Sequence, residues 1–121
     1  MNSGRHILFV DDDESIREFV TMALTDEGYE VATAQNGAAA LDLIDRKQPD
    51  LILLDMRMPV MDGWAFLKAY DGTPMPHAPI IALTASRNSP DVQVPAEVSG
   101  FLAKPFDLGD LLDMIGRHLQ P

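Results

Sequence analysis

Five side chains of the sequence could together bind a divalent cation and a phosphoryl group. Asp11 and Asp12 follow an early apolar run, Asp55 ends a second one, and Thr84 and Lys104 follow two later ones. Three carboxylates suit a hard cation that prefers oxygen ligands, such as Mg²⁺ or Mn²⁺. The Lys104 ammonium and the Thr84 hydroxyl could each contact a phosphoryl oxygen. With the cation and two phosphoryl oxygens held by these groups, Asp55 would be the in-line nucleophile that accepts the phosphoryl group.

These side chains can meet only if the segments before them are strands of one parallel sheet. Short apolar runs predict five strands, at residues 6–10, 29–34, 51–54, 80–83 and 101–103. Helical segments are expected between them and after the last one. This alternation favours a doubly wound sheet of five parallel strands, whose carboxyl ends share one edge.

Apolar stripes at helical spacing predict which helix faces contact the core. The first helix should use five residues and end near Gly28, and the last should use five more. The two stripes are Ile16, Phe19, Val20, Ala23 and Leu24, and Leu108, Leu111, Leu112, Ile115 and Leu119. Pro90 and Pro95 predict that the fourth helix is short or distorted.

Composition indicates one domain, over residues 1–121, with room for a core. A formal charge of −10 argues against direct nucleic-acid binding through phosphates and favours a cation or a basic partner. The absence of Cys and of long apolar runs leads us to expect a cytoplasmic protein without membrane insertion. Met1 close to the first strand fits a natural amino terminus, whereas the carboxyl end leaves open a stand-alone protein or an excised domain.

Each residue alone has a plainer interpretation. Thr84 could be a hydroxyl bonded to backbone, Lys104 a surface lysine, and the acidic pair a structural cation site. For Asp13 and Glu14 we prefer the plain interpretation, that they complement the positive end of the next helix. The joint pattern at successive strand ends is harder to obtain by chance and favours a phosphoryl site.

The order VDDDE, LLDMRMPVMDG, IIALTA and FLAKPF resembles the receiver domain of bacterial two-component response regulators over essentially the whole chain. The resemblance implies a flavodoxin-like (βα)5 fold and a phosphoacceptor at Asp55. It implies that Asp11 and Asp12 bind magnesium, Asp12 directly and Asp11 largely through water. Asp55 and the backbone carbonyl of Arg57 would complete the protein's share of the metal ligands. Thr84 and Lys104 match the family's switch hydroxyl and phosphate lysine.

The resemblance also implies a conformational switch and a set of partners. Phe101 falls at the family's switch aromatic, and the Lys104-Pro105 bond is expected to be cis, although statistics alone favour trans. The donor would be a sensor histidine kinase or a histidine phosphotransfer protein, and the downstream target a protein that the sequence does not identify. The chain would be a monomer or a phosphorylation-dependent dimer. We also expect the cationic Arg57 side chain to slow hydrolysis of the acyl phosphate.

Three other functions remain open at this stage. A phosphatase or phosphotransferase that uses Asp55 as a turnover nucleophile would want a second acid at position 57, where Arg57 cannot act as a general acid. A flavodoxin-like cofactor protein would want a glycine- and hydroxyl-rich loop where this chain has four consecutive acids, at residues 11–14. A degenerate receiver would bind partners without phosphorylation, but all five site positions are filled.

Overall fold

The computed structural model describes residues 4–58, 60–74, 77–84 and 98–119. Its five strands form one parallel sheet in the order β2-β1-β3-β4-β5. Their bounds are β1 His6–Val10, β2 Glu30–Ala34, β3 Leu51–Asp55, β4 Ile80–Thr84 and β5 Gly100–Ala103. All five predicted strands are therefore confirmed to within a residue, and the order is that of a flavodoxin-like sheet.

Four helices lie within the described residues: α1 Glu14–Asp26, α2 Gly37–Arg46, α3 Gly63–Asp71 and α4 Leu108–His118. The helix that we expected near Pro90 and Pro95 falls in residues 85–97, outside the described part of the chain. None of the described helices is long and apolar enough to span a bilayer.

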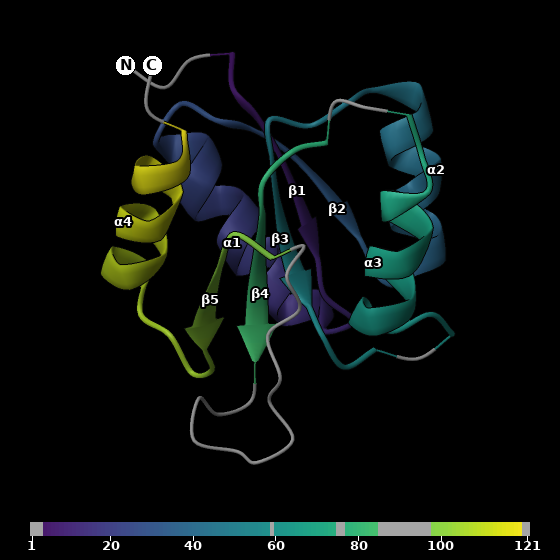
Figure 1. Cartoon of the computed structure of the whole chain (residues 1–121). Coiled ribbons are helices and arrows are strands. Elements are labelled where there is room, and N and C mark those ends of the chain that lie inside the picture. The colour runs from purple at the N-terminus through teal and green to yellow at the C-terminus, as the bar shows by residue number, and fades with distance from the viewer. Residues whose placement is uncertain (1–3, 59, 75–76, 85–97, 120–121) are drawn as a thin grey trace.

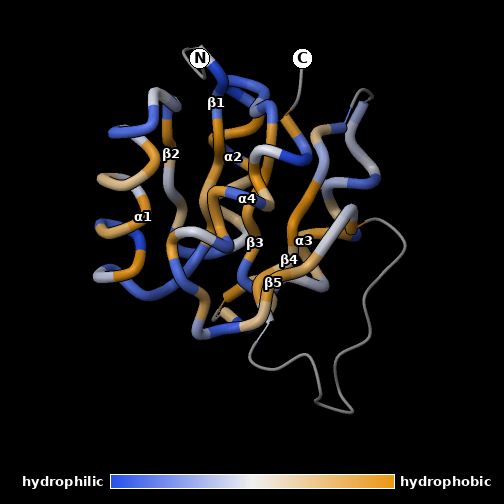
Figure 2. Tube along the Cα trace, turned by 90° about the vertical axis from the view of Figure 1, so that its left-hand side faces the viewer, coloured by the Kyte–Doolittle hydropathy of each residue, from blue (hydrophilic) through white to orange (hydrophobic). Residues whose placement is uncertain are grey.

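Helices cover both faces of the sheet, α2 and α3 on one face and α1 and α4 on the other (Figure 1). Successive strand residues alternate between the two faces, so Leu8 and Val10 pack toward α2 and α3, and Ile7 and Phe9 toward α1 and α4. The three central strands β1, β3 and β4 are therefore apolar and buried along nearly their whole length, which Figure 2 shows as orange segments, whereas the edge strands β2 and β5 are partly exposed. Two-sided burial explains why these central strands read as continuous hydrophobic runs.

Local sequence fixes where the described helices begin. Each has an Asp or Asn N-cap whose side chain accepts a hydrogen bond from the backbone N–H three residues later: Asp13, Asn36, Asp62 and Asp107. The prediction that Asp13 serves the next helix is thus confirmed. At the other end of α1, Gly28 has a φ of 94°, and the Tyr29 N–H donates to the Leu24 carbonyl over 3.1 Å. This left-handed stop confirms the helix end predicted near Gly28.

The predicted core stripe of α1 is wrong at Phe19. Val20 and Leu24 are buried, whereas the Phe19 side chain is 54% exposed. Each residue turns a helix by about 100°, so Phe19 lies on the flank of the face centred on Val20 and Leu24. Phe19, three residues after Ile16, therefore contacts solvent instead of the sheet.

The connection between β3 and α3 contains a backbone conformation that is unusual for a branched residue. Val60 has a φ of 70°, and its side chain is 86% exposed. A left-handed conformation costs an L-residue about 1 to 2 kcal/mol, and here little burial offsets that cost.

We predict that Val60→Gly stabilises the fold by about 0.5 to 1 kcal/mol, because glycine adopts this φ freely but loses more entropy on folding. Urea-induced unfolding would measure the change. Val60→Ala, which keeps a Cβ atom, is the matched control and should stabilise less. A glycine variant no more stable than the wild type would contradict the prediction.

Candidate functional site

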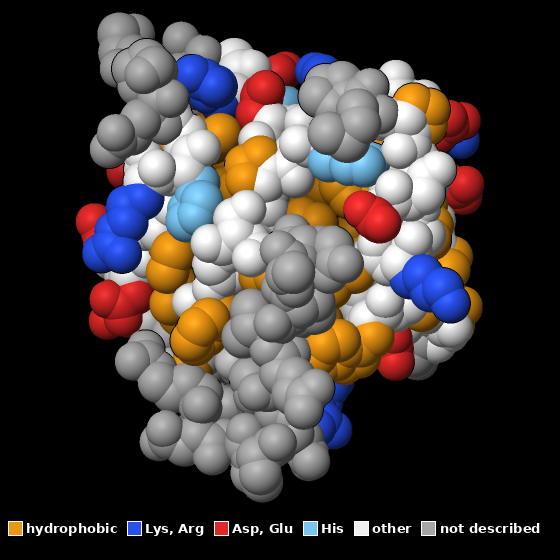
Figure 3. Space-filling view, viewed as in Figure 1, with side chains coloured by type: hydrophobic (Ala, Val, Ile, Leu, Met, Phe, Trp, Pro, Cys, Tyr) orange, Lys and Arg blue, Asp and Glu red, His pale blue; other side chains and the backbone are white. Residues whose placement is uncertain are grey.

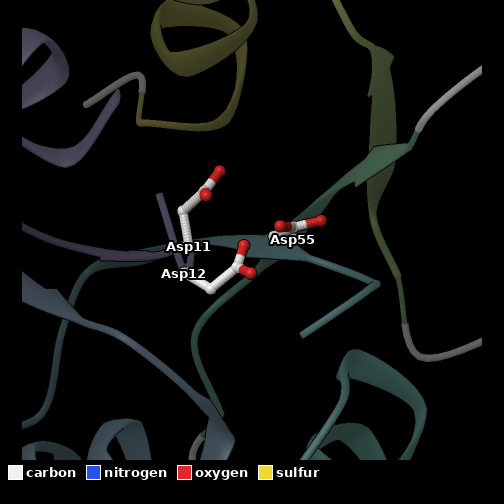
Figure 4. A group of neighbouring side chains, drawn as sticks. All are labelled: Asp11, Asp12 and Asp55. Carbon is white, nitrogen blue, oxygen red and sulfur yellow. The ribbon is translucent and has the colours of Figure 1, made fainter. Parts of the chain in front are cut away.

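The acidic side chains predicted from the strand ends lie together at the carboxyl edge of the sheet. Asp11 and Asp12 follow β1, and Asp55 ends β3, the strand paired with β1 in the register Val10↔Leu54 (Figure 4). Ligand oxygens of the three residues lie within 4.8 Å of one another. Asp11 and Asp55 are buried and Asp12 is exposed. An open cluster of carboxylate oxygens fits Mg²⁺ or Mn²⁺, which accept oxygen ligands and keep part of their water.

Lys104 joins the two buried acids of this cluster. Its Nζ lies 2.8 Å from Asp11 Oδ2 and 3.2 Å from Asp55 Oδ2, with the lysine side chain 25% exposed. Backbone N–H groups complete the arrangement, since Asp13 donates to Asp11 Oδ1 over 2.9 Å and Arg57 donates to Asp55 Oδ1 over 3.2 Å. Each buried carboxylate therefore has one ammonium and one amide partner, as buried charges require.

These contacts shift the ionisation of the site in defined directions. Burial raises the pKa of the Asp55 carboxyl above its usual range, and the Asp11 charge adds to that rise. The Arg57 N–H and the Lys104 ammonium oppose it without cancelling it. Burial lowers the pKa of Lys104, but its hydrogen bond to Asp11 and the two carboxylate charges outweigh this, so the pKa is raised overall. Lys104 therefore remains a cation in the site.

Thr84 ends β4, next to β3, and is the third buried polar residue of the described chain, with Asp11 and Asp55. Its Oγ1 is buried and makes no hydrogen bond to any described residue. A buried hydroxyl without a partner is costly, so a ligand oxygen at this position would be favoured. The simple alternative, a Thr84 hydroxyl bonded to backbone, is absent from the described structure.

The remaining predicted residues flank this cluster. The Arg57 side chain is exposed, and its peptide N–H contacts Asp55. The Lys104-Pro105 bond is cis, the isomer that the resemblance implies. Phe101 lies on the edge strand β5 and is 38% exposed. In Figure 3, hydrophobic side chains lie on the surface between α4 and α3. This is the face on which β5 lies toward the viewer in Figure 1.

Sequence reasoning did not single out Arg17. Its Nη1 donates a 2.8 Å hydrogen bond to the backbone carbonyl of Asp11. A cation four residues after the helix cap Asp13 lies one turn into α1, and side chains of a helix lean back toward its amino end. That spacing was the available signal.

Comparisons with known proteins agree with this geometry. The family model described as "Response regulator receiver domain" matches residues 7–116. Sporulation initiation phosphotransferase F of Bacillus subtilis is 36% identical over 115 residues, which cover 93% of this chain and 92% of that protein. Transcriptional regulatory protein GlrR of Escherichia coli is 37% identical over 117 residues, 95% of this chain but 26% of that protein. The chain thus spans about a quarter of that relative's length.

A solved structure gives the same result. The chemotaxis response regulator CheY4 of Vibrio cholerae superposes with a TM-score of 0.79 and is 38% identical, covering 95% of this chain and 98% of that one. The likeness therefore extends over nearly the whole chain.

The raised pKa of Asp55 predicts a pH-dependent cost to stability. Below the unfolded pKa near 3.8 the carboxyl is protonated in both states. As pH rises above 3.8 the unfolded state ionises first, so the folded state loses relative stability until pH passes the raised folded pKa. We therefore expect Asp55→Asn to have a higher Tm than the wild type at pH 7 without added Mg²⁺, and the gap to close in acid.

Thermal unfolding of both proteins from pH 3 to pH 7 would measure this gap. Asp42→Asn, at an exposed position on α2, is the control and should show no comparable gap. A wild type that is the more stable protein at pH 7 would rule out the interpretation.

Proposed function

Because the chain belongs to the response regulator receiver domain family, we propose that it accepts a phosphoryl group on Asp55 from a phosphohistidine donor in a magnesium-dependent reaction. The family is one of signalling domains rather than conventional enzymes. The observation that carries the proposal is the Asp55 carboxylate, 3.2 Å from Lys104 and clustered with Asp11 and Asp12.

The metal would be held by Asp11, Asp12, Asp55 and the backbone carbonyl of Arg57. Oxygens of the three carboxylates lie within 4.8 Å of one another, which fits a small hard cation. When bound, Mg²⁺ supplies positive charge that offsets the carboxylates and an incoming phosphoryl group. The cluster would be open to solvent on the side of Asp12, its exposed member.

In the transfer step, a carboxylate oxygen of Asp55 forms a bond to phosphorus while the P–N bond to the donor imidazole breaks. The electron pair stays on the imidazole nitrogen, which then takes a proton. Lys104 would hold one phosphoryl oxygen by charge, and the Thr84 hydroxyl would donate to another. Support for this role of Thr84 comes from its buried Oγ1, which has no partner among the described residues.

Phosphorylation would change the surface through Thr84 and Phe101. The β4–β5 register pairs Thr84 with Ala103 and Ala82 with Phe101, so the two side chains come from adjacent strands. Movement of Thr84 toward the phosphoryl group would vacate volume that a close-packed interior tends to refill. We propose that Phe101, now 38% exposed, turns inward to occupy it.

The wider role follows from the family and from coverage. A sensor histidine kinase or a histidine phosphotransfer protein would be the donor, and a separate protein or an attached output domain would be the target. GlrR, of which the chain covers 26%, is named as a transcriptional regulatory protein. We propose that residues 1–121 act as one receiver domain, as a monomer or a phosphorylation-dependent dimer.

We predict that the wild type gains the mass of one phosphoryl group after incubation with acetyl phosphate and Mg²⁺. Asp55→Asn should gain none, because it lacks the carboxylate nucleophile. Omission of Mg²⁺ should abolish the adduct in the wild type. Intact-protein mass spectrometry measures all three reactions.

Two results would overturn this proposal. One is an adduct on Asp55→Asn as large as that on the wild type, which would place the acceptor elsewhere. The other is a folded wild type that binds Mg²⁺ but takes no phosphate from acetyl phosphate or from a phosphohistidine protein.

A further prediction concerns Arg57. Its exposed guanidinium is carried two residues from Asp55, on the residue whose N–H bonds that carboxylate. We expect Arg57→Ala to shorten the half-life of phosphorylated Asp55 by about three- to tenfold, since pairing with the phosphoryl group would be lost. Loss of phosphate over time after removal of acetyl phosphate gives the rate. Lys68→Ala, at an exposed position on α3, is the control and should leave the rate unchanged. If Arg57→Ala loses phosphate no faster than the wild type, this role of Arg57 is refuted.

A further inference from the structure

Arg17 contacts the backbone on both sides of Asp12. Its side-chain Nη1 donates to the Asp11 carbonyl over 2.8 Å, and its backbone N–H donates to the Asp13 carbonyl over 3.0 Å. One residue of α1 therefore holds the peptide group before Asp12 and the carbonyl group of the residue after it. Only the first of these contacts depends on the identity of the side chain.

The Asp11 carbonyl lies just beyond the last backbone hydrogen bond between β1 and β2. The Asp11 N–H still donates to the Ala34 carbonyl over 3.0 Å, as the last contact of β1 with the β2 side. The carbonyl belongs to the planar peptide that joins Asp11 to Asp12, so a bond to it also fixes the positions of the Asp12 N and Cα atoms. The Asp12 side chain then extends from an anchored point, with only its own φ and χ angles left to vary.

Asp12 is the acid of the cluster that most needs such support. The Asp11 and Asp55 carboxylates are buried and bonded to Lys104 and to backbone N–H groups. The Asp12 side chain is exposed and belongs to the same group of oxygens. Its place in the cluster thus depends chiefly on the backbone that carries it.

Arg17 makes this bond in a strongly acidic neighbourhood. Among the ion pairs of the described residues none involves Arg17, although Glu14 and Glu18 are neighbours on α1. Its half-buried side chain is committed to a neutral carbonyl. The contact therefore fixes geometry more directly than it neutralises charge.

We propose that Arg17 is a positioning residue that holds Asp12 ready to bind a divalent cation. The proposal rests on the magnesium site of the proposed function. Partners that orient a metal ligand from behind typically contribute tenfold or more to metal affinity. Arg17 would act in this way through the peptide group of its ligand.

Isothermal titration calorimetry with MgCl₂ tests the proposal on the wild type, Arg17→Met and Arg17→Lys. Methionine keeps an unbranched apolar side chain but has neither a hydrogen-bond donor nor a charge. Lysine keeps the charge, but its side chain is shorter and ends in a compact ammonium instead of a planar guanidinium. We expect Arg17→Met to weaken Mg²⁺ binding about tenfold and Arg17→Lys to lie between it and the wild type. If Arg17 acted only as a nearby charge, methionine would strengthen binding and lysine would leave it unchanged.

Arg117→Met is the matched control for net charge. Arg117 is exposed, pairs with Asp113 over 2.6 Å and lies in the last turn of α4, which runs back from the site edge of the sheet. It should bind Mg²⁺ like the wild type. An equal affinity in Arg17→Met and in the wild type, with or without a change in Tm, would overturn the proposal, as would tighter binding by Arg17→Met.

The phosphorylation assay separates this proposal from the proposed function. Arg17→Met should need about tenfold more Mg²⁺ for half-maximal phosphorylation by acetyl phosphate and should approach the wild-type rate at saturation. A wild type that binds Mg²⁺ tightly but takes no phosphate would defeat the proposed function, while weaker Mg²⁺ binding by Arg17→Met would still support its positioning role. If Arg17→Met does not fold, Arg17→Lys carries the test, and wild-type affinity in that variant together with an unchanged Mg²⁺ requirement would overturn it.

Discussion

The contact on which the site depends is the bridge that Lys104 forms between two buried carboxylates. Its Nζ lies 2.8 Å from Asp11 and 3.2 Å from Asp55, and it comes from a segment 93 residues away from Asp11. Without a cation between them, like charges at a buried sheet edge would repel each other and favour protonation. The bridge therefore offsets the repulsion between the two carboxylates that the sheet brings side by side.

The sheet order makes this bridge possible. Placing β1 beside β3 brings Asp11 and Asp55 to adjacent strand ends, and placing β4 and β5 next in line brings Thr84 and Lys104 to the same edge. The Lys104 N–H donates to the Thr84 carbonyl over 2.6 Å, so the backbone fixes where the lysine starts. Two hydrophobic layers keep the strands in register, and the polar site lies where those layers end.

Most of this arrangement could be predicted because it follows from simple patterns. Strands buried on both faces read as apolar runs, and parallel strands necessarily share a carboxyl edge, so the cluster of Asp11, Asp55 and Lys104 was foreseeable. The exposure of Phe19 could not be predicted. Apolar residues at i+3 and i+4 spacing indicate which face of a helix is buried, but not how far the buried face extends around the helix. The φ of Val60 and the bond from Arg17 also escaped prediction. A dihedral angle leaves little trace in residue spacing, and the spacing of Arg17 from the helix cap does not say which group its side chain contacts.

The site also carries two unfavourable features that one ligand could relieve together. Burial raises the pKa of Asp55, so its ionised form is costly, and the Thr84 hydroxyl is buried without a partner among the described residues. A buried hydroxyl left unsatisfied costs about 1 to 3 kcal/mol. A phosphoryl group on Asp55 would convert the buried carboxylate into an acyl phosphate. The negative charge would then lie on phosphoryl oxygens, which Lys104 and a bound cation could contact, and acceptor oxygens would come toward Thr84. The same features that weaken the resting fold would then favour the phosphorylated one, which is the bias that a two-state switch requires.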